Sequence, residues 1–214
     1  MIFLEKGEIP KVLADNAAKW LAELKKEIAA GGKKVEYRKS KYNTKGIKDK
    51  IEQETHGKCA YCEAKLLHIT YGDIEHIIPK SEDIDLTFLW SNLTMSCDKC
   101  NTNKGEKMGI FDPYGSDPEI EFQFYGPMIS HRPGRHIAEN THIELQLNRV
   151  QLLERRHEAA KALATNLERL ANIADAGERE LLRNAIIAQE SSREREFSAC
   201  LKSLIEIKRQ QGQI

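Results

Sequence analysis

The stretch from residue 59 to residue 104 decides the fold. It contains four motifs: CAYC at 59–62, DIEHIIP at 73–79, WSNL at 90–93 and CDKCNTNK at 97–104. The two CxxC units are typical of a tetrahedral zinc site, because each turn places two thiolates on one side of the ion and two turns close its ligand shell. We therefore expect a structural Zn²⁺ with no open position for water, bound by Cys59, Cys62, Cys97 and Cys100.

The gap between the two cysteine pairs is long. Cys62 and Cys97 are separated by 34 residues, more than in compact zinc modules, so a further structure must be built inside the gap. His56 and His68 flank the first pair and could replace a zinc ligand. Because four thiolates are available, we expect both histidines at the surface.

The DIEHIIP motif inside the gap carries the candidate chemistry. Its β-branched residues predict a strand that Pro79 terminates. Carboxylates, an imidazole and the amides further on suit a hard divalent cation and a neutral histidine base. Adjacent strand residues point to opposite faces, so a bulge or the strand end must turn Glu75 or His76 toward a common site. Asp73 shares a face with Glu75 and is a rival metal ligand or a partner for a histidine.

The order of these motifs resembles the zinc-containing HNH endonucleases, whose site is a ββα-metal unit. More closely, KCAYCE at 58–63 with DIEH at 73–76 is similar to the PtuB-type HNH subunits of Septu and retron-associated antiphage systems. The close resemblance covers about residues 47–104. A looser likeness continues through FDPYG at 111–115 and LNR at 147–149.

The resemblance implies a role for each site residue. His76 would be the general base, and Glu75 and Asn101 would bind a catalytic Mg²⁺ or Mn²⁺. Asn92 would brace the loop between the two strands without binding metal. Many members of the family have histidine at the position of Asn101, and the family also uses asparagine there. Lys104 follows Asn101 by three residues and could lie one helical turn away, near the phosphate.

The flanking segments predict helices. Apolar residues recur at helical spacing from Pro10 to Ala30, and again from about Thr141 onward, where Gly177 interrupts the pattern and Leu181 to Ile205 predict a second helix. The sequence therefore predicts an α+β fold that is mostly helical, with a zinc-stapled ββα core between an N-terminal helix and a C-terminal αα hairpin. The expected segments are an N-terminal helix and basic linker at 1–50, the core at 51–115, a loop-rich segment with one short hairpin at 116–140, and the helical hairpin at 141–214.

Composition excludes several classes of protein. Hydrophobic residues make up 40% and charged residues 31% of the 214 residues, which fits neither a disordered, a collagen-like nor a membrane-embedded chain. The N-terminus has no apolar run of signal-peptide length, so we expect a cytoplasmic protein without membrane contact and without disulfides. Lys+Arg and Asp+Glu are both 33, but residues 33–50 carry a local charge of +6, with Tyr37 and Tyr42 interleaved. This run is either a solvated surface or a grip for phosphates.

The leading functional hypothesis is a metal-dependent endonuclease that hydrolyses phosphodiester bonds, DNA in preference to RNA, as the effector subunit of an antiphage complex. The chain has no GxxxxGK[ST] motif, and the resemblance implies a separate ATPase partner subunit. A homo-oligomer is a further option. The alternative hypothesis is a zinc-ribbon nucleic-acid-binding or adaptor subunit that breaks no bond.

Overall fold

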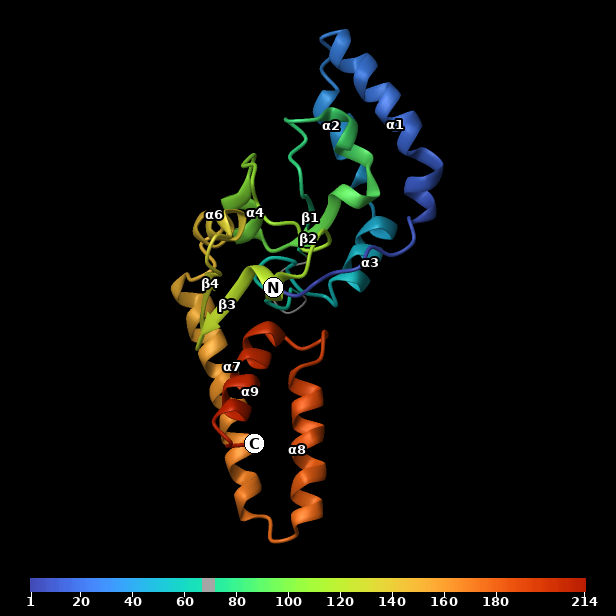
Figure 1. Ribbon diagram of the computed structural model, residues 1–214. Coiled ribbons are helices and arrows are strands. Elements are labelled where there is room, and N and C mark those ends of the chain that lie inside the picture. The colour runs from blue at the N-terminus through green and yellow to red at the C-terminus, as the bar shows by residue number, and fades with distance from the viewer. Residues whose placement is uncertain (67–71) are drawn as a thin grey trace.

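A ββα unit lies at the centre of the chain. The computed structural model describes residues 1–66 and 72–214. Strand β1 (Asp73–His76) pairs antiparallel with β2 (Leu93–Ser96), and helix α4 (Asp98–Lys104) follows β2 directly (Figure 1). The register places His76 opposite Leu93 and Asp73 opposite Ser96. The unit predicted from the four motifs is therefore present, although β1 ends three residues before Pro79.

The connection between the two strands is built from short 3₁₀ turns. These are η2 (Ile84–Phe88) and η3 (Trp90–Asn92). Asn92 ties the connection together: its Oδ1 accepts from the Ile78 backbone N–H at 2.8 Å, and its Nδ2 donates to the Ile78 carbonyl at 2.9 Å. This buried asparagine supplies the hydrogen bonds that irregular backbone cannot make for itself.

The N-terminal region packs against this connection. Helix α1 (Lys11–Ala29) begins after Pro10, as predicted, and Trp20 meets Phe88 of η2 edge to face, with ring centroids 5.6 Å apart. The basic run at 33–50 folds into helix α2 (Val35–Lys39), η1 (Ser40–Tyr42) and most of α3 (Lys45–Glu54), which Thr44 caps. In Figure 1, α2 lies above the ββα unit and α3 lies beside it.

The segment after α4 forms the predicted short hairpin. Helix α5 (Pro118–Glu121) leads into β3 (Phe122–Tyr125), which pairs antiparallel with β4 (Met128–His131) ahead of helix α6 (His136–Glu144). The side-chain amide of Asn148 accepts from the Ile129 N–H at 2.9 Å and donates to the Ile129 carbonyl at 2.7 Å. This pair of bonds fixes the hairpin to the start of the C-terminal helices.

The C-terminal region differs from the predicted two-helix hairpin. Helix α7 (Val150–Arg169) and η4 (Leu170–Asn172) are followed by α8 (Ala176–Glu190), but the expected second helix breaks, and α9 (Ser198–Gln210) packs between α7 and α8 (Figure 1). The break ends at Phe197, which is buried and in the left-handed conformation with φ 58°. The spacing of apolar residues does not predict this break, because a tertiary contact causes it.

That contact involves Glu63, which follows the first cysteine pair. Its carboxylate accepts from the Ser198 hydroxyl at 3.1 Å and from the Ala199 N–H at 3.3 Å, at the start of α9, and it pairs with Lys58 and with the Met1 amino group. Burial opposes ionisation of Glu63, but these positive charges outweigh it and lower its pKa to about 2. The C-terminal helices are thus anchored to the cysteine turn by a buried carboxylate.

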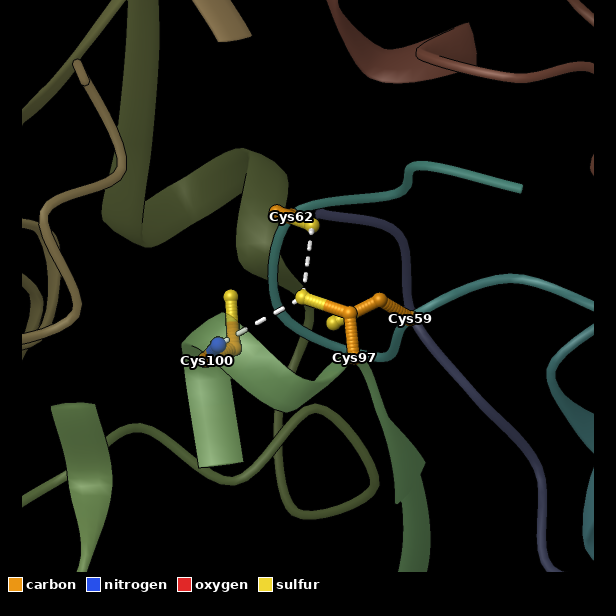
Figure 2. A group of neighbouring side chains, drawn as sticks. All are labelled: Cys59, Cys62, Cys97 and Cys100. Carbon is orange, nitrogen blue, oxygen red and sulfur yellow. Dashed lines mark hydrogen bonds between the residues drawn. The ribbon is translucent and has the colours of Figure 1, made fainter. Parts of the chain in front are cut away.

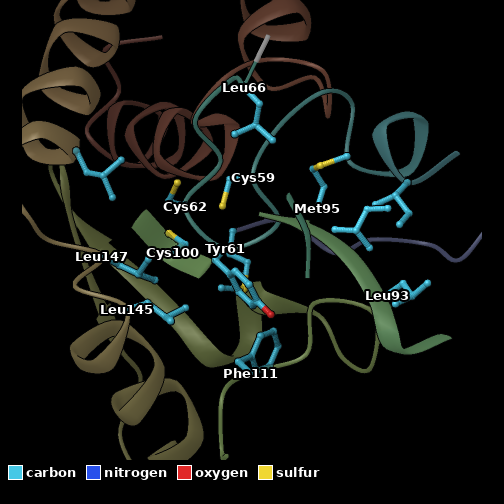
Figure 3. Packing of buried hydrophobic residues seen from close by; sticks show 14 of the residues in the cluster. Cys59, Tyr61, Cys62, Leu66, Leu93, Met95, Cys100, Phe111, Leu145 and Leu147 are labelled. Atoms are coloured by element: carbon cyan, nitrogen blue, oxygen red, sulfur yellow. The ribbon is translucent and has the colours of Figure 1, made fainter. Parts of the chain in front are cut away.

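One hydrophobic cluster joins these parts. It contains residues from the N-terminal helices, the cysteine turns, the hairpin and α7, and Figure 3 shows Tyr61, Met95, Phe111 and Leu147 packed around the cysteines. Gly72, just before β1, has φ +60°, and a Cβ there would lie 2.6 Å from Leu66 and 2.9 Å from Met95.

Within the described ranges, no helix is long and apolar enough to cross a membrane.

Candidate active site and zinc centre

The four cysteines converge on one point. Their sulfur atoms all lie within 4.8 Å of one another, and Cys62 Sγ is 3.9 Å from Cys97 Sγ (Figure 2). A tetrahedral ion with Zn–S bonds of about 2.3 Å requires sulfur atoms at roughly this spacing. The donor set and its geometry therefore fit the predicted zinc site. His56, one of the alternative ligands, is not part of the cluster, and His68 lies outside the described residues.

Two different backbone devices hold the cysteine pairs. The first pair sits on a tight turn, in which the Cys59 N–H donates to the Ala64 carbonyl at 2.9 Å and Glu63 has φ 63°. The second pair opens α4, where Cys97 is the N-cap and its sulfur accepts from the Cys100 N–H at 3.4 Å. The Ala60 N–H donates to the Met95 carbonyl at 2.9 Å, which joins the first turn to β2. The zinc centre thus staples the ends of the ββα unit.

Arg149 lies against this centre. Its guanidinium nitrogens are 3.8 Å from the sulfur atoms of Cys97 and Cys100. Burial alone would lower the pKa of Arg149, but the neighbouring sulfurs raise it. Four thiolates around one Zn²⁺ leave a net charge of −2, so a fixed cation beside them stabilises the site. The sequence signal for Arg149 was the loose resemblance of the LNR stretch at 147–149 to the family.

His76 is held as a neutral imidazole at the end of β1. Its Nε2 is 2.9 Å from the Thr87 carbonyl oxygen, which can only accept, so Nε2 carries the hydrogen and Nδ1 carries the lone pair. The imidazole is 3% exposed, and burial lowers its pKa to about 4 despite the bond to Thr87, with the charges of Lys80 and Lys104 in the same direction. The bond partner of Nε2 is a backbone oxygen 11 residues away, so the sequence contains no signal that predicts this hydrogen bond.

Glu75 forms a buried ion pair with Lys104. The Lys104 ammonium is 2.8 Å from Glu75 Oε1 and 2.7 Å from the His76 carbonyl oxygen. Burial raises the pKa of Glu75, and Lys104 opposes this shift. Lys104 is fully buried. This position differs from the predicted one near the phosphate.

Asp73 and Asn101 form a second pair at the exposed edge of the unit. Asn101 Nδ2 donates to Asp73 Oδ2 at 3.0 Å. Asp73 is therefore a partner of the predicted metal ligand Asn101, and it stays outside the pocket described next. The side chain of Asn92 binds the backbone of Ile78 and of Leu86 in the strand connection, and the bracing role that the resemblance implies for it stays a prediction.

A single pocket of about 410 Å³ brings the predicted groups together. Glu75, His76 and Asn101 all line it. The alternation of strand residues does not separate Glu75 from His76, because His76 is the last residue of β1 and its ring turns toward Thr87 at the strand end. Carboxylate and amide oxygens beside a neutral imidazole are a donor set that suits a hard divalent cation and a base.

The opposite wall of the pocket was not predicted as part of the site. It is formed by Glu36, Lys39 and Tyr42 from α2 and η1, and by Lys80 after β1. The Tyr42 ring packs edge to face on His76, with centroids 4.6 Å apart. The aromatic residues within the basic run were the available signal, but the placement of Tyr42 against His76 depends on the packing of α1 and α2.

Comparisons with known proteins agree with this geometry. Residues 59–107 match the family model for HNH endonucleases. The Septu protein PtuB of Bacillus thuringiensis is 28% identical over 159 residues, which cover 72% of this chain and 57% of that protein. The Septu protein PtuB of Bacillus mycoides (strain KBAB4) is 27% identical over 156 residues, 56% of this chain and 52% of that protein. The chain thus spans about half the length of these curated relatives, and no solved structure matches it.

Proposed function

We propose that this chain, an HNH family member of the PtuB type, is a metal-dependent endonuclease that hydrolyses phosphodiester bonds in nucleic acid. The observation that carries the proposal is the placement of a neutral, buried imidazole, whose Nε2–H is bound to the Thr87 carbonyl, in the same pocket as Glu75 and Asn101. A base of low pKa keeps its lone pair at neutral pH, which the activation of water requires.

His76 has a defined part in the reaction. Nδ1 takes a proton from a water molecule as the water oxygen bonds to phosphorus, and the P–O bond to the 3′ oxygen breaks. This step leaves a 5′-phosphate, and the 3′ oxygen takes up a proton to become a 3′-hydroxyl. The Thr87 carbonyl holds the Nε2–H through the step, so that the ring stays oriented while it gains positive charge.

Glu75 and Asn101 would hold the divalent cation, Mg²⁺ or Mn²⁺. When bound, the cation stabilises negative charge on the phosphate and on the leaving oxygen. Lys104 positions the Glu75 carboxylate through their ion pair. Asp73 accepts a hydrogen bond from the amide nitrogen of Asn101, which leaves the amide oxygen of Asn101 as the metal-binding atom. The zinc centre, with its four protein ligands, stabilises the fold and takes no part in the chemistry.

The biological setting follows the similarity to PtuB. We infer that the chain is the nuclease subunit of a cytoplasmic antiphage defence complex of the Septu or retron-associated type and that it acts with an ATPase subunit. We propose DNA in preference to RNA as the substrate. Gel filtration of the chain with the ATPase should give one shared peak, whereas two separate peaks at micromolar concentration would count against the complex.

Cleavage assays test the proposed activity. Purified protein with Mg²⁺ or Mn²⁺ should nick or cut plasmid DNA, and RNA is assayed in parallel. His76→Ala should lower the rate by about 10²–10⁴-fold, because the general base is lost, while zinc content stays unchanged. His157→Ala, on the exposed face of α7, is the matched control. Full activity in His76→Ala would refute the assignment of the base, and binding without cleavage by the unaltered protein would favour the zinc-ribbon adaptor.

A further inference from the structure

The wall of the pocket that faces His76 comes in part from outside the HNH match at residues 59–107, since Lys80 alone of the residues named next lies within it. Lys39 and Tyr42 precede residue 59, and Lys80 lies in the strand connection. These residues place two lysines and a tyrosine hydroxyl within one pocket that also contains the proposed base. The two lysines differ in their partners, and this difference identifies the one that is available to a ligand.

Lys80 is a cation without a carboxylate partner. Its ammonium is 3.0 Å from the Tyr42 hydroxyl oxygen and 5.0 Å from the centre of the Tyr42 ring, and within residues 1–66 and 72–214 it forms no ion pair. Lys39, in contrast, binds Glu36 at 2.9 Å, and Lys104 binds Glu75 at 2.8 Å. Lys80 therefore has no directly paired carboxylate among the described residues, although its charge acts from a greater distance to lower the pKa values of Glu36, Glu75 and His76.

Tyr42 adds a second donor. An ammonium group has hydrogens to donate and no lone pair, so the Tyr42 oxygen must accept from Lys80, and its own O–H remains to be donated. The ring is held at the same time by its edge-to-face contact with His76. An N–H and an O–H donor thus flank the imidazole at fixed positions.

We propose that Lys80 and Tyr42 form a phosphate-binding subsite that holds the nucleic-acid backbone against His76. The inference rests on the proposed function, which supplies the substrate class, and deepens it by naming the groups that bind the phosphodiester. The carboxylates in the pocket do not oppose this assignment strongly, because Lys39 compensates Glu36 and Lys104 compensates Glu75; Glu106 is the remaining acidic group on the wall. A phosphodiester accepts both hydrogen bonds through its non-bridging oxygens.

The chain contains a matched control pair on the neighbouring elements α2 and η1. Lys41 lies 5.7 Å from the centre of the Tyr37 ring, in an arrangement like that of Lys80 and Tyr42. Lys41 is bound to Glu23 at 3.3 Å, Tyr37 is 64% exposed, and neither lines the pocket. The same substitutions at these two positions therefore change charge and hydroxyl content without changing the subsite.

Equilibrium binding tests the subsite separately from cleavage. The 214-residue chain is titrated, without added divalent metal, against a short labelled DNA duplex and the corresponding RNA duplex over a range of salt concentrations. Lys80→Gln should weaken binding about 10-fold or more and reduce the slope of log K against log[salt] by about 1, since one phosphate contact is lost. Tyr42→Phe, which keeps the ring, should weaken binding about 2- to 10-fold. Lys80→Arg should keep the salt slope, and Lys41→Gln and Tyr37→Phe should match the unaltered protein.

The outcomes separate this inference from the proposed activity. If Lys80→Gln binds with the same affinity and salt slope as Lys41→Gln, the subsite is overturned, even if cleavage by the unaltered protein is intact. If Lys80→Gln loses binding and no metal supports cleavage by the unaltered protein, the subsite stands and the nuclease assignment fails. Absence of nucleic-acid binding by the unaltered protein overturns the subsite. Circular dichroism and zinc content of each variant establish that it is folded.

Discussion

The ammonium group of Lys104 bridges the Glu75 carboxylate, at 2.8 Å, and the carbonyl oxygen of His76, at 2.7 Å. Lys104 is the last residue of α4, while Glu75 and His76 end β1. A single buried cation thus fixes the end of the strand to the helix that begins at the zinc centre. The seven residues of α4 thus join the cysteine cluster to the candidate active-site pocket.

Removal of the Lys104 charge should destabilise the protein. Lys104→Met leaves the Glu75 carboxylate buried without a partner, and a loss of about 3–5 kcal/mol in the free energy of unfolding is expected. The double variant Glu75→Gln with Lys104→Met should recover part of this loss, because no buried charge remains. Lys107→Met, which breaks a half-exposed pair with Glu144, is the control and should cost about 1 kcal/mol or less. Urea denaturation measures all three, and equal losses at Lys104 and Lys107 would contradict the structure.

Substitution of Asn101 should change the dependence on divalent metal. Asn101→Ala removes a proposed metal-binding oxygen, so a higher Mg²⁺ concentration should be needed for half-maximal cleavage. Asp73→Asn keeps an oxygen that can accept the Asn101 N–H bond and should shift the metal titration less. A larger shift for Asp73→Asn than for Glu75→Gln would instead identify Asp73 as the ligand.

Loss of one zinc thiolate should unfold the core. Cys97→Ser removes both a zinc ligand and the N-cap sulfur of α4, and binding of a structural metal contributes directly to the free energy of folding. The melting temperature and the zinc content should therefore fall together. Cys200→Ser is the control, because Cys200 is buried outside the cluster. Full zinc content in Cys97→Ser would show that the fourth ligand lies elsewhere.

Arg149 should influence how tightly zinc is held. Arg149→Met removes the guanidinium beside Cys97 and Cys100, and partners of metal ligands contribute about 10- to 100-fold to metal affinity. Competition with a chelator should show faster zinc loss in this variant. Arg155→Met, on the same helix and paired with Glu196 at the surface, should retain zinc like the unaltered protein; similar zinc loss in both variants would exclude a specific role.

Acid should weaken the contact between β4 and α6. His131 Nδ1 and His142 Nε2 are 3.1 Å apart, and burial together with the charge of His131 lowers the pKa of His142 below 6.5, although Glu139 opposes the shift. The unfolded chain therefore binds more protons in the window just below pH 6.5, so stability is full above this pH and falls as the pH decreases through it. His142→Gln should show a shallower loss of stability in thermal melts over this window. An unchanged slope would exclude this histidine pair as the cause.

Much of the core could be read from residues that lie close together in the chain. The chemistry of the two CxxC units predicts the zinc ligands, and the β-branched residues between them predict the first strand. The resemblance to HNH proteins implies the complete ββα unit, and the structure and the family match agree with both. The roles of His76, Glu75 and Asn101 remain predictions, although the structure brings all three to one pocket. Periodicity likewise located α1 and α7.

Only the tertiary structure decided the rest, because the decisive contacts join groups that are far apart in sequence or belong to the backbone. The tautomer of His76 depends on the Thr87 carbonyl, the position of Lys104 on a buried carboxylate, and the break before α9 on Glu63, 135 residues from Ser198. The sequence by itself determined which chemical groups are present and their local spacing. Packing determined which of them are buried together, and burial sets the charges, the pKa values and the bonds still open to a substrate.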